Sequence, residues 1–243
     1  MPRIPVAERR DALIEAAIRV MERDGVAETT TRKIAAEASM PLASLHYAFA
    51  SRGELIAAAA RKLALEIVEV MRSSAKVDGD LPATLRRLLG GYVEFLRANP
   101  GRVLALYETQ AAGVRMPELQ QIAQNRVYRG KELVRYFLER AGAEAGVRYT
   151  HPVAEIGATL LESLDGFSLH WITVRDDFEL DSSVELAVRW IADLTEPLSP
   201  EGAEQARAAL RELDDDLPAE LIEGQRTMPH ILGDAAPSTG ERP

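Results

Sequence analysis

The residue types that most often do chemistry are spread widely along this chain of 243 residues. It has no cysteine, which excludes thiol catalysis, disulfides and zinc sites built on thiolates. Neither H-E-x-x-H nor a G-x-x-x-x-G-K-S/T phosphate loop occurs. The four histidines are far apart, at His46, His151, His170 and His230. The sequence therefore predicts no catalytic residue, no metal site and no cofactor.

One carboxylate pair is the exception to this scatter. Glu162 and Asp165 are three residues apart in "ATLLESLDGFSLHW", so a helix would place them on neighbouring faces. Such a pair is more often a solvated or interfacial stripe than an acid–base pair. An all-helical enzyme that acts on a small molecule is therefore kept only as an alternative.

A second kind of chemistry is indicated by the segment "TTTRKIAAEASMPLASLHYAFASRGEL", residues 29–55. It predicts two short helices, Thr31–Ala38 and Pro41–Phe49, joined by three or four residues, which is the pattern of a helix-turn-helix. Pro41 suits the first turn of the second helix, where its missing N–H has no partner to lose. Apolar side chains would hold the two helices together, namely Ile34, Ala35, Ala38, Leu45 and Phe49.

The outward face of the second short helix carries a polar and small set of side chains that a core would not need. This mixture suits thymine methyl groups, base edges and phosphates in the major groove of DNA. The residues on this face are Leu42, Ala43, Ser44, His46 and Tyr47.

The distribution of charge permits a nucleic-acid partner although the whole chain carries a net charge of −9. The first 53 residues hold eight basic and seven acidic side chains, so their net charge is +1 and the remainder carries −10. Repulsion of a polyanion is therefore weakest at the N-terminal end. Three early arginines, Arg3, Arg9 and Arg10, fit either a solvated terminus or an arm that touches phosphates.

The rest of the chain also reads as helix, because apolar residues recur every three or four positions. A first helix, Val6–Asp24, would turn Leu13, Ala17, Val20 and Met21 inward. An S-x-x-E capping box, Ser51 with Glu54, opens a long helix over residues 52–73, and a second one, Ser182 with Glu185, opens a later helix. Further helices are expected at 81–99, 102–112, 117–141, 152–174, 182–196 and 200–213.

The chain resembles the TetR family of transcriptional regulators. The resemblance lies in "TTRKIAAEA", "PLASLHYAF" and "SRGEL", and it covers about residues 8–55 closely. It implies an all-α fold, in which a three-helix DNA-binding domain (1–53) is joined by a long helix to a ligand-binding and dimerisation domain (54–213). Residues 214–243 are expected to form a mobile tail.

The family's DNA contacts carry over residue by residue. Arg32 would reach a base edge and Thr31 a phosphate, while Leu42, Ala43, Ser44 and Tyr47 would face the groove. His46 takes the place of a phosphate-contacting tyrosine, and Arg52 that of a phosphate-binding lysine. Two positions depart from the pattern: Ser39 replaces a preferred glycine at a left-handed turn, and Ala48 replaces a frequent histidine.

The resemblance also implies an apolar, aromatic-lined effector pocket in the second domain. Arg126 shares a helical stripe with apolar residues, so its guanidinium is expected to point inward. Its partner would be Glu162, Asp165 or an anionic group of the effector. The expected ligand-binding residues are Tyr92, Phe95, Leu96, Tyr107, Ile122, Arg126, Leu133, Glu162, Phe167 and Trp171, with Leu104 and Phe137 as further wall.

A homodimer is the last implication of the resemblance. Two late helices would pair with their copies through apolar stripes, unless those stripes serve only the core of the chain itself. The stripes are Ile156, Leu160, Leu164, Phe167 and Trp171, and Val184, Ala187, Val188, Ile191 and Leu194.

The resulting hypothesis is a cytoplasmic repressor that leaves a palindromic double-stranded DNA operator when a small hydrophobic or amphipathic effector binds. A cytoplasmic location is expected because no apolar run of about 18 residues and no signal peptide is visible. An activator or other DNA-binding protein without an effector is the alternative within the DNA-binding class.

Overall fold

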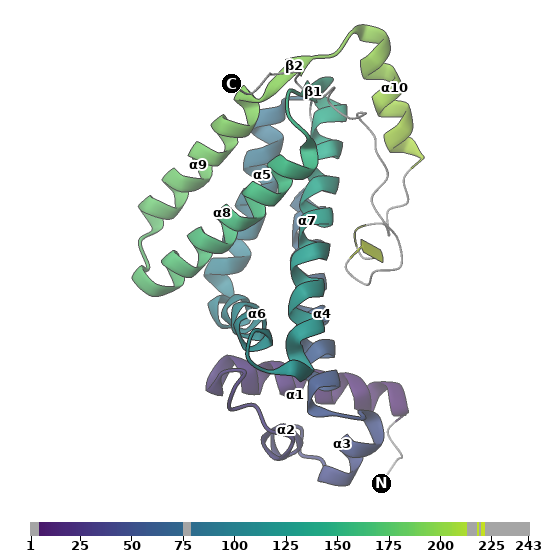
Figure 1. Cartoon of the computed structure of the whole chain (residues 1–243), viewed down its shortest axis with the longest axis vertical. Helices are drawn as coiled ribbons and strands as arrows, with labels where there is room; N and C mark the ends of the chain where they lie inside the picture. Colours follow the sequence, from purple (N-terminus) through teal and green to yellow (C-terminus); the bar gives the residue numbers. More distant parts are fainter. Residues whose placement is uncertain (1–4, 75–78, 213–217, 219, 222–243) are drawn as a thin grey trace, which may run out of the picture. The chain divides into compact units, whose positions relative to one another are not determined.

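The computed structural model describes residues 5–74, 79–212, 218 and 220–221. Over these residues the chain forms ten α-helices and two short strands (Figure 1), which confirms the all-α fold class. The helices are α1 (Val6–Asp24), α2 (Thr31–Glu37), α3 (Leu42–Ala48), α4 (Arg52–Ser74), α5 (Leu81–Ala98), α6 (Pro100–Gly113), α7 (Pro117–Ala145), α8 (Val153–Val174), α9 (Asp177–Asp193) and α10 (Pro200–Arg211). The strands are β1 (Val147–Tyr149) and β2 (Thr195–Pro197).

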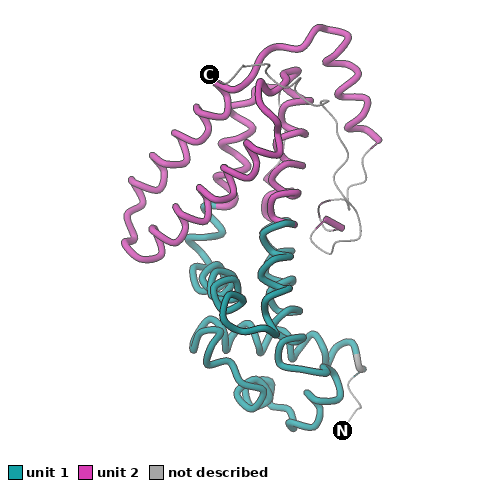
Figure 2. The backbone as a smooth tube through the Cα atoms, in the orientation of Figure 1, with its two compact units in different colours: residues 1–69, 93–128 teal, residues 70–92, 129–243 magenta. Residues whose placement is uncertain are grey.

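The chain divides into two compact units, and three helices contribute to both (Figure 2). The first unit contains α1 to α3, most of α4, all of α6, the end of α5 and the start of α7. The second contains the remaining parts of α4, α5 and α7 with everything from β1 onward. The functional division at residue 53 stays a prediction. Of the tail predicted from residue 214, the structure describes Pro218, Glu220 and Leu221, which are helical, and Leu221 is buried.

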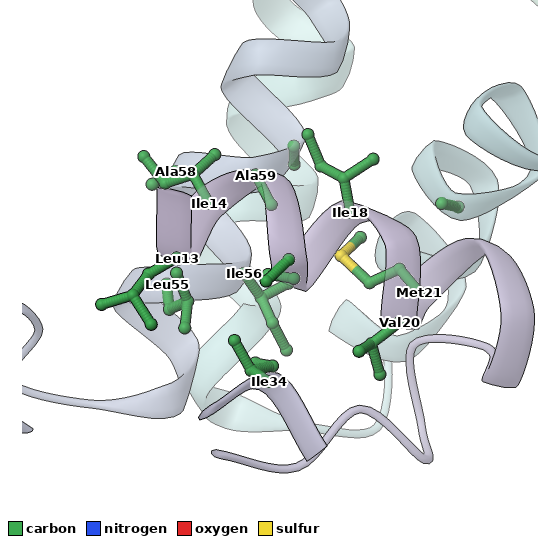
Figure 3. Packing of buried hydrophobic residues seen from close by; sticks show 14 of the residues in the cluster. Leu13, Ile14, Ile18, Val20, Met21, Ile34, Leu55, Ile56, Ala58 and Ala59 are labelled. Carbon is green, nitrogen blue, oxygen red and sulfur yellow. The ribbon is translucent and has the colours of Figure 1, made fainter. Parts of the chain in front are cut away.

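The first unit is built around α1, whose apolar side chains are buried on more than one side. The predicted inward residues Leu13, Ala17, Val20 and Met21 are all buried, but so are Ile14, Ala16 and Ile18. Figure 3 shows that these side chains meet Ile34 of α2 and several residues of α4 in one cluster. Because α1 is covered from several directions, it positions both the short helices and the long one.

The capping box at the start of α4 is confirmed. The backbone N–H of Glu54 donates to Ser51 Oγ at 3.0 Å, and the Glu54 carboxylate accepts from the N–H of Ala50 at 2.8 Å. The bond from Ala50, followed by one from Arg10, lowers the pKa of the Glu54 carboxyl. This turn fixes the direction in which α4 leaves α3.

The capping box predicted at Ser182 is wrong. Helix α9 begins five residues earlier, at Asp177, and Asp176 is its N-cap: the Asp176 carboxylate accepts from the N–H of Glu179 at 3.0 Å. An aspartate in this position satisfies a free N–H of the first turn as well as a serine does. Ser182 and Glu185 therefore lie inside the helix.

The antiparallel pair of β1 and β2 was not foreseen. Val147 lies opposite Pro197 and Tyr149 opposite Thr195, and the short sheet links the end of α7 to the segment before α10. Three-residue strands are too short to produce a recognisable alternation of apolar and polar residues. The Tyr149 hydroxyl donates to the Leu138 carbonyl at 2.8 Å, which secures the sheet on α7.

The apolar stripes of α8 and α9 pack inside the second unit. These two helices lie side by side (Figure 1). Ile156, Leu160, Leu164 and Trp171 of α8 are buried, and so are Ala187, Val188 and Ile191 of α9. Phe167, Val184 and Leu194 are half-buried. Most of the stripe residues thus contribute to the core of the chain itself, and the pairing of these helices with a second subunit stays a prediction.

Candidate nucleic-acid interface

Helices α2 and α3 form a tight helix-turn-helix. The Thr30 hydroxyl caps α2 by accepting from the N–H of Lys33 at 3.3 Å. Between the helices, Ser39 adopts φ 53°, in the left-handed region, and the N–H of Met40 returns to the carbonyl of Ala35 at 2.9 Å. The left-handed turn predicted at Ser39 is thus present, and it reverses the chain within four residues.

Helix α3 is anchored by two buried side chains, Leu45 and Phe49. The Arg10 guanidinium lies 4.0 Å from the centre of the Phe49 ring, and the same group donates to the carbonyl of Ala48 at 2.6 Å and to Glu54 at 3.0 Å. Arg10 therefore pins the end of α3 to the start of α4. The sequence suggested for Arg10 either a solvated terminus or an arm for phosphates, because its contact with Phe49 is not visible in the sequence.

The opposite face of α3 is accessible. Tyr47 is 76% exposed, Ala43 and His46 are exposed, and Leu42 and Ser44 are half-buried. In α2, Arg32 is exposed and Thr31 is half-buried. A large aromatic side chain that stays exposed while its neighbours anchor the helix is a common sign of a binding surface. Contact of these seven residues with DNA stays a prediction.

Arg52 differs from the role that the resemblance implied. Its Nε donates to the carbonyl of Thr29 at 2.6 Å, one Nη to the carbonyl of Val26 at 2.7 Å, and the other Nη to Glu118 at 3.1 Å. The guanidinium thus binds the loop between α1 and α2. This is a structural role, and a contact with phosphate stays only a prediction.

Ion pairs fix α2 against α1. Glu37 of α2 accepts from Arg19 at 2.7 Å and from Arg23 at 2.9 Å, while Lys33 lies 3.0 Å from Asp24. Hydrogen bonds from Arg19 and Arg23 lower the pKa of the Glu37 carboxyl, and bonds from Arg23 and Lys33 lower that of Asp24. Sequence reasoning missed Glu37 because its partners are 14 and 18 residues away in α1.

The predicted effector residues fall in both units. In the first unit Arg126 donates to the Gln110 side chain and stacks over the Tyr107 ring at 5.0 Å from its centre. These three residues join α6 to α7. Phe95, Ile122, Tyr107 and Arg126 are half-buried, and Leu96 is buried.

In the second unit a buried hydroxyl pair joins α5 to α8. Tyr92 Oη lies 2.8 Å from Ser168 Oγ, which in turn donates to the carbonyl of Leu164. Trp171 donates to Asp177 at 2.9 Å, so its indole N–H secures the turn into α9. Leu133 is buried, Phe167 is half-buried, and Glu162 is exposed and pairs with Lys131 at 3.2 Å.

Within the part of the chain that the structure describes, no helix is long and apolar enough to span a bilayer. Those same residues contain no group of three or more histidine, aspartate or glutamate side chains arranged to hold a metal ion.

A helix-turn-helix followed by a long helix and a larger helical unit defines a class of bacterial DNA-binding regulators, and comparison with known proteins agrees. Residues 13–59 match the family described as "Bacterial regulatory proteins, tetR family". The HTH-type nicotine-responsive transcriptional repressor HdnoR of Paenarthrobacter nicotinovorans is 29% identical over 177 residues, which are 72% of this chain and 89% of the relative.

Solved structures extend the similarity over most of the chain. The multidrug binding protein EbrR complexed with ethidium is 27% identical and has a TM-score of 0.60, over 75% of this chain and 98% of EbrR. A TetR transcription regulator from Haloarcula marismortui, 20% identical, shares the fold with a TM-score of 0.64, over 78% of this chain and all of that one. Residues 13–59 therefore match the DNA-binding domain of the TetR family, and the chain is similar over most of its length to transcriptional regulators of that family.

The left-handed turn at Ser39 leads to a stability prediction. A non-glycine residue in this region costs about 1–2 kcal/mol, and glycine gives back part of the gain through its greater freedom in the unfolded chain. Ser39→Gly is therefore expected to raise the free energy of unfolding by about 0.5–1 kcal/mol, measured by urea denaturation. The control Ser39→Ala keeps the strain and should leave stability nearly unchanged. A destabilised Ser39→Gly would contradict the left-handed conformation.

Proposed function

We propose that this chain represses transcription by binding a near-palindromic operator as a homodimer, and that a small hydrophobic or amphipathic effector releases it. The match of residues 13–59 to the TetR family, together with the similarity to HdnoR and EbrR, supports a ligand-responsive transcriptional regulator. The direction of regulation, the symmetry of the operator and the kind of effector are the proposed parts. Action in the cytoplasm, where bacterial DNA lies, is part of the same proposal.

The observation that carries DNA binding is the exposed face of α3. Seven-residue helices are not stable alone, so α3 keeps its shape through Leu45 and Phe49 and leaves Tyr47 and His46 outside. A rigid helix with small and polar exposed side chains fits the major groove, where a tyrosine and an arginine can contact base edges and phosphates. This supports a regulator over the enzyme considered first.

Support for the kind of effector comes from both relatives and residues. HdnoR is named as nicotine-responsive, and EbrR has been solved with ethidium and with imidazole. All three compounds carry aromatic nitrogen heterocycles. In the first unit of this chain, half-buried Tyr107 and Phe95 provide aromatic surface of the kind that binds such molecules. We propose an aromatic, amphipathic effector on these grounds.

Support for a homodimer comes from exposed apolar residues on the hairpin of α8 and α9. Phe178 is 82% exposed and Leu186 64%, and Leu169 and Val174 are also exposed. Among the outward positions of α8, Thr159, Gly166 and Thr173 are uncharged and small, and they lie beside the exposed Glu155, Glu162 and His170. Exposed apolar side chains beside small ones suit contact with a second copy, which would bring two α3 helices to successive major grooves.

The DNA prediction separates base readout from general attraction. Tyr47→Ala and Arg32→Ala are expected to relax discrimination at particular base pairs by about 1–3 kcal/mol. The measurement is binding to duplexes selected by the parent from a random-sequence pool, and to single-base variants of them. The matched controls Tyr128→Ala and Arg115→Ala remove exposed side chains outside the helix-turn-helix and should change nothing. A uniform loss of affinity with unchanged site preference would refute base readout.

The assembly prediction concerns mass in solution. Light scattering at micromolar concentration should give about twice the chain mass of 26.7 kDa. Leu186→Asp is expected to give the monomeric mass, because it buries a charge in the proposed interface. Val114→Asp introduces the same charge at an exposed apolar residue of the first unit and should remain dimeric. A monomeric parent, with and without DNA, contradicts the homodimer.

The effector prediction uses Tyr107 and Arg126. A panel of amphipathic aromatic compounds that includes nicotine is screened by the rise in melting temperature of the parent. For the compound with the largest effect, Tyr107→Ala and Arg126→Ala should raise the concentration that releases DNA by about tenfold. Tyr128→Ala serves as the control. If both variants release DNA at the parent's concentration, these residues do not line the effector site.

A further inference from the structure

The loop of residues 25–30, between α1 and α2, is held from outside the helix-turn-helix. Gly25 has φ 81°, and the N–H of the next residue, Val26, donates to Glu108 Oε2 of α6 at 2.8 Å. Arg52 binds the carbonyls of Val26 and Thr29 in the same loop. Because Val26 and Thr29 are fully buried, these bonds satisfy groups that water cannot reach.

The loop determines where α2 begins. Thr29 Oγ1 donates to the carbonyl of Gly25 at 2.8 Å, and Thr30 is the N-cap of α2. A shift of Val26 would therefore pass to the first turn of α2 and, through the tight turn at Ser39, to α3. Neither α2 nor α3 is long enough to hold its place alone.

Glu108 lies in the helical turn that carries one predicted effector residue, Tyr107, and that contacts a second one, Arg126 of α7. Tyr107 precedes it, and Gln110 follows two residues later; both engage Arg126 of α7. One turn of α6 thus touches Arg126 on one side and the α1–α2 loop on the other. Any displacement of this turn changes both contacts.

The start of α6 is fixed more firmly than the turn at Glu108. Arg102 lies 2.6 Å from Glu66 of α4 and 3.4 Å from Glu22 of α1. Six residues separate it from Glu108, about 9 Å along the helix, so a tilt of about 7° about Arg102 would move Glu108 by about 1 Å. If this displacement is directed away from Val26, it lengthens the bond of 2.8 Å beyond hydrogen-bonding distance.

We propose that Glu108 is a positioning residue for DNA recognition, which lets α6 set the place of α2 and α3 through the N–H of Val26. The inference rests on the proposed function, since it concerns how the effector-binding part controls the same DNA-binding surface. Glu108 touches no DNA itself. Its carboxylate acts through the α1–α2 loop, which Arg52 also binds. The Arg52 guanidinium in turn donates to Glu118 of α7.

The test compares three substitutions of Glu108 on the duplex that the parent selects from a random-sequence pool. Glu108→Ala removes the acceptor and should weaken DNA affinity about tenfold, while the base preference stays the same. Glu108→Gln keeps an oxygen acceptor in the same place and should stay within about twofold of the parent. The control Glu94→Ala removes an exposed carboxylate of α5 in the same unit and should have no effect.

Two readouts distinguish positioning from general stability. Affinity is measured well below each variant's melting temperature, and amide hydrogen exchange of Val26 and of α2 is measured without DNA. If Glu108 is a positioning residue, Glu108→Ala should show faster amide exchange at Val26 and α2 together with the lower DNA affinity. Glu108→Asp has a side chain shorter by one methylene, so its exchange rate and its affinity should lie between those of the parent and of Glu108→Ala. Glu108→Asp also serves if Glu108→Ala does not fold.

The outcomes separate the two claims. A lower melting temperature with unchanged affinity would mean that Glu108 is only structural, and the inference would fail while the proposed function stands. Equal loss of affinity in Glu108→Gln and Glu108→Ala would also overturn it, because the oxygen acceptor would then be irrelevant. A parent protein that selects no duplex would overturn the proposed function itself.

Discussion

The burial of α1 on more than one side is the constraint on which the first unit depends. A helix that packs against a single layer buries one stripe, but α1 buries Leu13, Ile14, Ile18 and Val20, which point in different directions. Small residues, Ala16 and Ala17, let neighbouring helices approach closely. Helices α2 and α3 therefore share their core with α4 and α6, and they do not form a core of their own. Figure 3 shows the part of this core that α1, α2 and α4 form.

This shared core makes the polar contacts around α1 more important for geometry than for stability. Surface ion pairs such as those of Arg19 and Arg23 with Glu37 contribute little energy each. They instead fix the angle and register of α2 on α1, which apolar packing alone determines less sharply. The bonds of Arg52 and Glu108 to the α1–α2 loop do the same at the other end of α2, where buried backbone groups require partners.

Periodicity in the sequence was enough to predict the helices, because apolar residues recur every three or four positions in long segments that begin or end at capping residues. The bounds of α1 and the capping box at Ser51 agree with the structure. Periodicity does not reveal what covers a stripe. The stripes of α8 and α9 were expected to contact a second subunit, yet most of their residues are buried within the chain itself.

Long-range polar contacts were the part that sequence could not supply. Arg52 matched a phosphate-binding position in the family pattern, yet its partners, Val26, Thr29 and Glu118, are 23 to 66 residues away in sequence. Sequence spacing predicts which side chains are neighbours within one helix. Contacts between residues of different elements, such as those of Arg52, depend on how the helices pack against each other. The residues of the exposed face of α3 were easier to predict, because a helix whose anchoring side is known must present its other side outward.

The length of α3 explains why DNA recognition in this chain cannot reside in that helix alone. Seven residues form barely two turns, fewer than an isolated helix needs to be stable. Its conformation is therefore maintained by Leu45 and Phe49, by the strained turn at Ser39 and by Arg10 over the Phe49 ring. Leu45 and Phe49 belong to the core cluster around α1, and Arg10 of α1 also binds Glu54 at the start of α4, while α1 itself packs against α6. A change in the packing of α1 must then alter the position of the exposed residues of α3, even though none of the side chains on that face changes.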